Sequence, residues 1–243
     1  MKMLVILAVF LFSISGVSGQ IHSPALSITH LTGDFYVYTT YRLLDAGPYP
    51  SNSMYLVTSK GVILFDTPWD TTQFKPLLDS IKFKHHKDVI MCISTHFHAD
   101  RTAGLEFYRK MGIRTYTSKK TDDLCKERHE KRAGYLIYKD SSFNVGRHEF
   151  QTYYAGPGHS PDNIVIWFPK EKIIYGGCLV KSVEAPDLGY LGDANVKEWA
   201  TTIKNIQQKC KDPNYIIPGH LDWTSKKSLS HTLDLIRQYE EKK

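Results

Sequence analysis

The chain has 243 residues, of which 42% are hydrophobic and 23% are charged, and its formal net charge is +6. This composition is typical of a globular protein and excludes a disordered or fibrous chain, and the length is ample for one large core. The basic residues gather at 82–87 and 119–132, on segments that we expect to be helical or to end helices. Solvated helix faces explain such clusters better than a nucleic-acid surface does, so we expect no nucleic-acid partner.

The N-terminus has the pattern of a secretory signal peptide. Lys2 precedes an apolar stretch at 3–14, and small residues at 17–19 precede Gln20. The apolar stretch is shorter than the ~20 residues that a membrane-spanning helix needs. We therefore predict a signal peptide at residues 1–19 and a single domain at 20–243, exported to the periplasm or the cell exterior, with the periplasm favoured and no stable membrane association.

The four cysteines all belong to the predicted mature chain, in a compartment that permits disulfides. One bridge is possible, and the spacing does not say which. Cys92 lies in an apolar run, and Cys125 and Cys210 fall on helical patterns, so these three have the context of buried core residues. Cys178 follows two glycines and is the cysteine whose context indicates chemistry.

The first elements after the signal peptide are strands. Alternating or continuous β-branched and aromatic residues predict strands at 25–31, 35–41, 53–58 and 62–65, and the turn at 59–61 joins the last two into a hairpin. Between them, residues 42–50 form a predicted loop punctuated by proline and glycine, with apolar residues at its tip. Such a loop is either a flap over a site or a loop folded onto the body, and both interpretations stay open.

Helices and strands then alternate to the end of the chain. We predict helices at 71–83, 101–110, 121–132, 195–210 and 228–241, the first with Thr71 as its N-cap and Pro76 inside it. We predict strands at 89–95, 113–117, 142–145, 150–154, 163–168, 172–175 and 215–218. The strands fall into two groups, each followed by helices and each ending in an apolar strand that precedes a histidine. This order predicts an α/β fold with two sheets packed face to face and helices outside.

Six side chains with metal-ligating chemistry follow these apolar strands. His96, His98 and Asp100 stand on alternate positions after the predicted strand at 89–95, and His159, Cys178 and His220 each lie in a glycine-rich turn. The first three alone could be surface histidines beside a helix-capping aspartate. Together the six are enough for two zinc ions.

Five motifs in this order resemble those of the subclass B1 metallo-β-lactamases. They are at residues 96–101, 158–163, 176–182, 187–190 and 218–220, so that the resemblance covers essentially the whole mature chain. It implies a four-layer αββα sandwich with two mixed sheets flanked by helices. It also implies a monomer that hydrolyses the amide bond of β-lactam antibiotics (penicillins, cephalosporins and carbapenems) and so confers antibiotic resistance.

The resemblance also implies a role for each site residue. His96, His98 and His159 would hold one zinc ion with a water or hydroxide in its fourth position, and Asp100, Cys178 and His220 would hold a second. The hydroxide would attack the lactam carbonyl carbon, the first zinc would polarise the carbonyl oxygen, and the second would stabilise the leaving nitrogen, without an acyl-enzyme.

Four further residues match positions around the metal site. Lys181 matches the family's lysine for the substrate carboxylate, a charge-assisted contact that lysine suits. Asp66 and Arg101 match positions that orient the ligands and balance the Cys178 thiolate. Tyr190 stands where many family members have an asparagine that contacts the lactam carbonyl, and the longer tyrosine side chain reaches the carbonyl only through water.

Two alternative functions remain. The wider superfamily includes thioesterases, glyoxalase II-like enzymes and RNA-processing nucleases, which typically have a histidine after the motif aspartate and an aspartate in place of Cys178. Arg101 and Cys178 favour the lactamase branch, and the first alternative is a zinc-dependent ester or thioester hydrolase of the same fold. The second is a catalytically silent zinc-binding protein, against which Lys181 argues because metal storage needs no partner for a substrate carboxylate.

Overall fold

Two mixed β-sheets pack face to face in the computed structural model, which describes residues 26–242. The predicted signal peptide at 1–19 lies outside these residues. The larger sheet has seven strands in chain order: β1 (Ser27–Thr32), β2 (Phe35–Leu44), β3 (Gly47–Thr58), β4 (Gly61–Phe65), β5 (Val89–Ile93), β6 (Arg114–Ser118) and β7 (Tyr135–Ile137). The smaller sheet has the order β12-β11-β10-β9-β8: β12 (Tyr215–Pro218), β11 (Ile173–Gly177), β10 (Val165–Phe168), β9 (His148–Tyr153) and β8 (Ser141–Val145).

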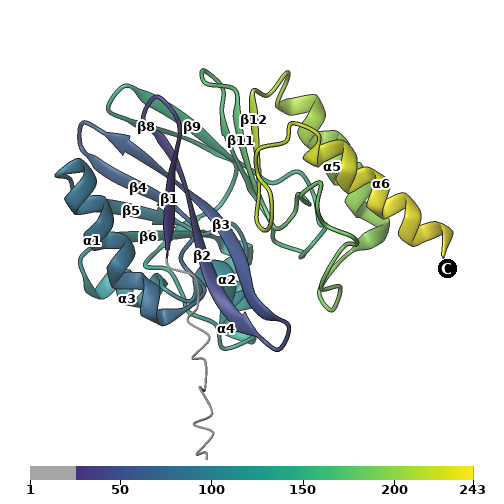
Figure 1. Cartoon of the computed structure of the whole chain (residues 1–243), viewed down its shortest axis with the longest axis horizontal. Helices are drawn as coiled ribbons and strands as arrows, with labels where there is room; N and C mark the ends of the chain where they lie inside the picture. The colour runs from purple at the N-terminus through teal and green to yellow at the C-terminus, as the bar shows by residue number, and fades with distance from the viewer. Residues whose placement is uncertain (1–25, 243) are drawn as a thin grey trace, which may run out of the picture.

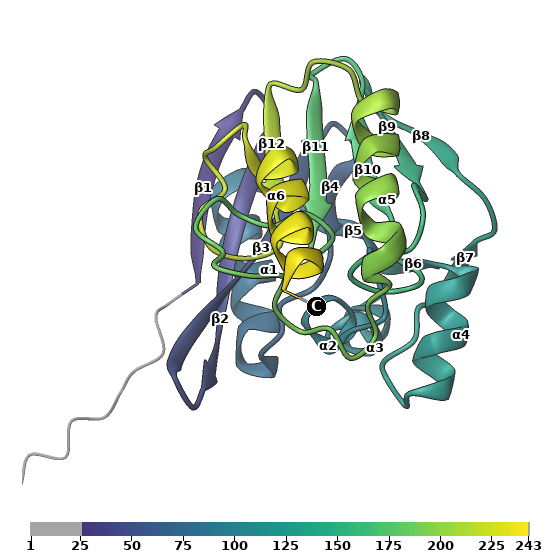
Figure 2. The same cartoon turned by 90° about the vertical axis from the view of Figure 1, so that its right-hand side faces the viewer.

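Helices cover the outer faces of both sheets. They are α1 (Phe74–His85), which follows the short 3₁₀ helix η1 (Thr71–Gln73), α2 (Ala99–Thr102), α3 (Leu105–Lys110), α4 (Lys119–Glu127), α5 (Val196–Lys209) and α6 (Ser228–Glu241). In Figure 1, α1 and α3 lie on one side of the molecule and α5 and α6 on the other. Figure 2 shows α5 and α6 side by side in front of the smaller sheet. The predicted four-layer αββα sandwich is confirmed. Within residues 26–242, no helix has both the length and the apolar character needed to cross a bilayer.

Strand alternation divides the apolar side chains among three layers of core. In β4, Ile63 and Phe65 belong to the core between the sheets, whereas Val62 and Leu64 pack with α1. The strands of the smaller sheet alternate likewise between the central core and the layer beneath α5 and α6. Because both faces of these strands are covered, they are continuous apolar runs in the sequence.

The predicted loop at 42–50 is instead the end of a β-hairpin. β2 runs to Leu44 and β3 starts at Gly47, and their register continues through the pair Leu43 and Pro48. Residues 47–53 of β3 pair with β2 but not with β4, whose pairing starts at Met54. On the edge that faces away from β2, Asn52 N donates to Gly219 O, and Pro48 and Pro50 face the same way by strand alternation. A proline, which lacks an N–H donor, is tolerated on such an edge.

Several helix boundaries also differ from the prediction. The predicted helix at 101–110 is two helices, because the Arg101 carbonyl accepts hydrogen bonds from Thr67 N (3.1 Å) and Ser94 Oγ (2.7 Å) where a longer helix would use it internally. Asp70, not Thr71, caps the start at η1, and Pro76 lies in the first turn of α1, where a missing N–H has no cost. The helix predicted at 121–132 is α4, which Ser118 caps and which ends at Glu127.

The ends of parallel strands from both sheets meet at one edge of the sandwich. β4 pairs with β5, and β11 with β12, in parallel. Backbone hydrogen bonds join the sheets there, from Asn52 N to Gly219 O (2.8 Å) and from Ile164 N to Thr95 O (2.9 Å). Five of the six predicted ligands follow these strands, and the turn between β9 and β10 adds His159, so this edge brings the six together.

Candidate metal centre and active site

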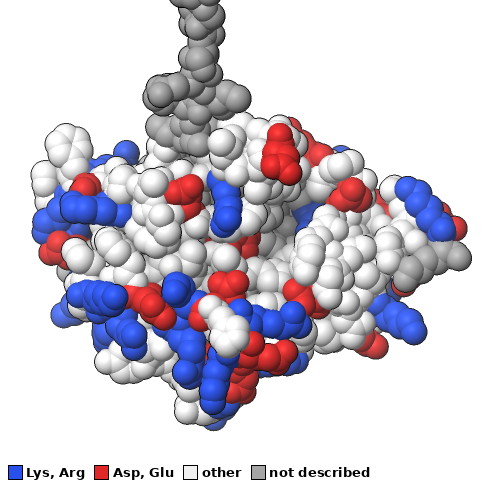
Figure 3. Space-filling view, turned by 90° about the horizontal axis from the view of Figure 1, so that it is seen from below, with Lys and Arg blue, Asp and Glu red and all other residues white. Residues whose placement is uncertain are grey.

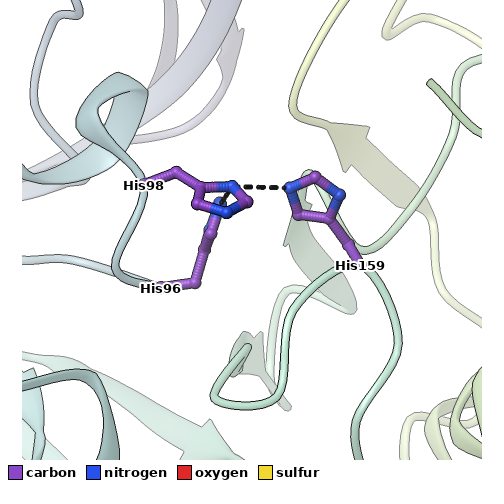
Figure 4. A group of neighbouring side chains, drawn as sticks. All are labelled: His96, His98 and His159. Carbon is purple, nitrogen blue, oxygen red and sulfur yellow. Dashed lines mark hydrogen bonds between the residues drawn. The ribbon is translucent and has the colours of Figure 1, made fainter. Parts of the chain in front are cut away.

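Three histidine rings face one another at this edge. His96 and His98 follow β5, and His159 lies in the turn between β9 and β10. The His98 Nδ1 atom lies 3.1 Å from His96 Nε2 and 3.1 Å from His159 Nε2 (Figure 4). The rings are nearly perpendicular to one another, with centroids 4.8–4.9 Å apart.

This arrangement fits a zinc ion. Nitrogen ligands in a tetrahedral zinc site lie about 3.3 Å from one another, close to the separation found here. Burial lowers the pKa of His96 and of His159 well below the ordinary histidine value, so both rings are neutral at pH 7 and each offers a lone pair. Three neutral imidazoles are a donor set that zinc accepts.

The second ring nitrogen of His98 is held by a carboxylate. His98 Nε2 lies 3.0 Å from Asp193 Oδ2, and Arg128 lies 3.2 Å from the other Asp193 oxygen. A partner of this kind fixes the tautomer so that Nδ1 is free to bind metal. Asp193 was not among the predicted site residues, because it stands in no recognisable motif.

The other three predicted ligands form a second triangle beside the first. Cys178 Sγ, Asp100 Oδ2 and His220 Nε2 lie 3.2 Å from one another. Ligands of a zinc ion with this donor set lie roughly 3.4 to 3.6 Å apart. Asp100 Oδ1 is 3.9 Å from His96 Nε2, so the two triangles adjoin.

The electrostatics of the second triangle suit a divalent cation. Burial alone would raise the pKa of Asp100, but Arg101 and His220 hold it well below the ordinary value, so the carboxylate is ionised. Burial raises the pKa of the Cys178 thiol, which a bound metal would offset by stabilising the thiolate. A thiolate, a carboxylate and an imidazole are a set for which zinc is well matched.

Asp66 and Arg101 are both buried beside the candidate ligands. Arg101 is fully buried and donates to Cys178 Sγ (3.0 Å) and to the carbonyl of Gly219 (2.9 Å). The Asp66 carboxylate accepts from Thr95 N (2.6 Å) and Thr95 Oγ1 (2.8 Å). Burial raises the pKa of Asp66 to about 6, although the Arg101 charge opposes this shift.

The Asp66 carboxylate also accepts from Tyr175 OH (2.5 Å), a residue that sequence analysis missed. The alternation of β11 could have located it, since that pattern points the Tyr175 hydroxyl into the core between the sheets, where it needs a partner.

A groove of about 420 Å³ opens onto the ligands. Its walls include His98, Asp100, His159 and His220, and its rim includes Leu44 and Tyr49 of the β2–β3 hairpin together with Trp69, Lys181 and Tyr190. Figure 3 views the molecule from below, the side on which the hairpin tip lies in Figure 1, and basic and acidic side chains are interspersed across this face.

Lys181 and Tyr190 both line this groove but lie in different environments. The Lys181 ammonium lies 5.4 Å from the ring centroid of Trp199, and burial lowers its pKa, against the opposing charge of Cys178. Tyr190 is 63% exposed, and its hydroxyl lies against Gly192, in the space that a Cβ atom there would fill.

The cysteines are free. Cys92, Cys125, Cys178 and Cys210 are all buried thiols, and the structure forms none of the disulfides that the sequence left open.

Comparison with known proteins identifies the family. Residues 46–220 match the model of the metallo-β-lactamase superfamily. A metallo-β-lactamase type 2 of Elizabethkingia meningoseptica is 43% identical over 100% of this chain and 96% of its own length, and metallo-β-lactamase IND-1 of Chryseobacterium indologenes is 39% identical over 86% and 87%. The solved structure of a metallo-β-lactamase from Pontibacter korlensis superimposes with a TM-score of 0.85, at 32% identity, over 88% of this chain and 99% of its own. The chain therefore belongs to the metallo-β-lactamase superfamily and, within it, to the subclass B1 enzymes.

Proposed function

We propose that this protein hydrolyses the amide bond of β-lactam antibiotics, namely penicillins, cephalosporins and carbapenems, and thereby confers antibiotic resistance. One observation carries the proposal: two adjoining triangles of ligand atoms open into a groove that has Lys181 at its rim. The relatives named as metallo-β-lactamases, which match this chain over most of its length, support it.

We assign two zinc ions to each chain. His96, His98 and His159 would hold one, and Asp100, Cys178 and His220 the other. Zinc at such sites supplies a Lewis acid and lowers the pKa of a coordinated water toward 7. The first ligand set is neutral and the second carries a carboxylate and a thiolate, so the protein itself gives the two ions different net charges.

The residues around the metal site orient the substrate and the ligands. The Lys181 ammonium would bind the carboxylate that β-lactams carry beside the ring nitrogen. The exposed side chains of Leu43 and Leu44 at the hairpin tip would contact apolar substituents of the substrate. Asp193 holds His98 in one tautomer, and Arg101 donates to Cys178, so that each ligand set enters the reaction already aligned.

We further propose that residues 1–19 direct export to the periplasm, where the mature chain acts as a monomer on diffusing substrate. The apolar segment and small-residue cleavage site in the sequence support export.

A chromogenic cephalosporin tests the function. The purified mature chain should hydrolyse it, lose activity with a zinc chelator and recover with added zinc, while a His98→Ala variant prepared in parallel should be inactive under all three conditions. Faster turnover of an acyl-thioester than of any β-lactam would instead identify a thioester hydrolase. Stoichiometric zinc binding without turnover of either substrate would identify a silent zinc-binding protein.

A further inference from the structure

The hydroxyl group of Tyr175 lies between two buried side chains of opposite charge. It is 2.5 Å from Asp66 Oδ2, 3.1 Å from Arg101 Nη1 and 3.2 Å from the carbonyl oxygen of Asn52. The hydroxyl has one hydrogen and donates it to the Asp66 carboxylate, which is the closest acceptor and is negatively charged. Its oxygen is then the acceptor for Arg101, so Tyr175 joins a carboxylate and a guanidinium whose nearest atoms are 3.7 Å apart.

The orientation of Arg101 depends on its two terminal nitrogens. Nη2 donates to Cys178 Sγ and to Gly219 O, and it lies 3.1 Å from Asp100 Oδ2. Nη1 donates to Asn52 O (2.8 Å), Ser53 Oγ (3.3 Å) and Tyr175 OH. The buried Nε atom has no hydrogen-bond partner. Because the guanidinium is planar, whatever fixes Nη1 also fixes the direction in which Nη2 points.

Among the hydrogen-bond acceptors of Nη1, Tyr175 is the one that is itself hydrogen-bonded to a charged side chain. Asn52 supplies a main-chain carbonyl and Ser53 a distant hydroxyl, whereas the Tyr175 oxygen is polarised by the hydrogen bond that it donates to Asp66. The chain of contacts Asp66–Tyr175–Arg101–Cys178 therefore runs from the end of β4 in one sheet to the end of β11 in the other.

We propose that Tyr175 is a positioning residue for the metal site of Asp100, Cys178 and His220, and that it acts through Arg101. This inference rests on the proposed assignment of those three residues to a second zinc ion. The Tyr175 hydroxyl holds the guanidinium in the orientation that aims Nη2 at the sulfur, so that the sulfur is aligned before metal binds. No contact joins Tyr175 or Arg101 Nη1 directly to the three-histidine site. The link between that site and this chain of residues is Thr95 Oγ1, which donates to Asp66 (2.8 Å) and lies 3.5 Å from His96 Nδ1.

Tyr175→Phe tests the proposal, because it removes one oxygen atom and keeps the ring in the core. Removal of an outer partner of a metal ligand weakens metal binding by about tenfold or more. Competition with a chromophoric chelator should show the second zinc equivalent bound about tenfold more weakly and the first unchanged within about twofold. In cobalt-substituted protein, the absorption due to charge transfer from the thiolate should shift or weaken.

Tyr38→Phe is the matched control. Tyr38 is equally buried and its hydroxyl also donates to Asp66, but to the main-chain oxygen (2.8 Å) and not to the carboxylate. Both variants should lose thermal stability, and only Tyr175→Phe should lose affinity at the second site. Equal losses of affinity in the two variants, or no loss in Tyr175→Phe, would overturn the proposal.

An Arg101→Lys background tests whether Tyr175 acts through the guanidinium. There, Tyr175→Phe should have no further effect on the second zinc, and independent, multiplying effects would overturn the proposal. The rate of zinc release from the loaded protein is measured as well, since it does not require the metal-free variant to be folded. Suppose that the wild-type protein binds two zinc ions and hydrolyses the cephalosporin, and that Tyr175→Phe binds zinc as the wild type does: only the inference about Tyr175 then fails. One zinc ion per wild-type chain at saturation would overturn both this inference and the assignment of a second zinc ion.

Discussion

The ring of Tyr190 meets the ring of His98 edge to face, with centroids 5.7 Å apart and planes at 74°. With its hydroxyl against Gly192, the tyrosine presents its ring to the metal centre, not its oxygen. We therefore expect Tyr190→Phe to lower kcat/KM less than about tenfold, whereas loss of a direct oxyanion donor costs ~100-fold or more. Steady-state kinetics with a zinc assay on each sample checks this. A larger loss with both metals retained would show that the hydroxyl contacts the reacting carbonyl.

Lys181→Ala should remove about 2 kcal/mol of transition-state stabilisation, or about 30-fold in kcat/KM, because a charge-assisted contact to the substrate carboxylate is lost. The ammonium also packs over Trp199, so Lys181→Met, which keeps a long stem without the charge, separates the two effects. The kcat/KM of the wild type should fall with added salt, and both variants should lose this salt dependence. Wild-type activity in Lys181→Met would exclude an ionic role.

Cys178→Ser should weaken one zinc equivalent far more than the other. A neutral hydroxyl supplies none of the negative charge that a thiolate gives to a divalent ion, and the three-histidine triangle does not include Cys178. Calorimetric titration of metal-free protein with zinc measures the two affinities. Similar weakening of both would mean that the two triangles bind metal as one unit, contrary to their assignment here.

Shortening the β2–β3 hairpin beyond Arg42 and Tyr49 should raise KM across β-lactams and leave zinc affinity nearly unchanged. Leu43 is 51% exposed at the tip, where it would cover bound substrate. Tyr49 and Pro50, which contact the His220 ring, are kept in the shortened hairpin. A variant with polar residues at 43 and 44 and the full hairpin length is the control for chain length. Unchanged kinetics in both would leave the hairpin without a role in substrate binding.

The stability of the metal-free protein should fall as the pH falls below about 6.5, the ordinary histidine pKa. Burial lowers the pKa of His96, His159 and His220, so the folded state binds fewer protons there than the unfolded state does, and stability present above pH 6.5 is lost in acid. Asp66, with a pKa raised to about 6, has the opposite effect. The stability that it contributes is fully present below the pKa of an unfolded aspartate and is lost as the pH rises through 6.

His159→Gln isolates one of these histidines, because the Asp66 contribution cancels in the difference from wild type. Denaturant unfolding at a series of pH values should show the wild type losing stability relative to the variant by up to about 1.4 kcal/mol per pH unit below 6.5. Parallel pH profiles for the two proteins would contradict the assignment of a lowered pKa to His159.

The six ligands could be predicted because each follows an apolar run that ends a strand or sits in a glycine-rich turn. Their division into two sets came only from the family resemblance, since spacing along the chain does not say which of His159 and His220 lies nearer to His96. The hydrogen bonds from His98 to Asp193 and from Tyr175 to Asp66 were not predictable as pairs, because each joins residues about 100 positions apart.

The errors in the fold have the same origin. Prolines at 48 and 50 have the composition of a loop, but they lie where β3 has no strand partner on the edge away from β2, and a strand tolerates them there. The break between α2 and α3 depends on Thr67 and Ser94, which lie outside the helix and compete for the Arg101 carbonyl. Local pattern therefore predicted the layers, and contacts between distant segments determined the boundaries.

Each triangle of ligands draws on both sheets: His96, His98 and Asp100 follow β5, whereas His159, Cys178 and His220 follow strands of the smaller sheet. Metal at either triangle would thus be a cross-link between the two halves of the sandwich, available only after they have docked. A ligand that binds only the native state stabilises it by an amount that grows with the logarithm of the ratio of ligand concentration to Kd. The supply of zinc would therefore set how often the two halves separate. Cells starved of zinc would lose this protein to proteolysis as well as to inactivity, and resistance would decline faster than the loss of cofactor alone explains.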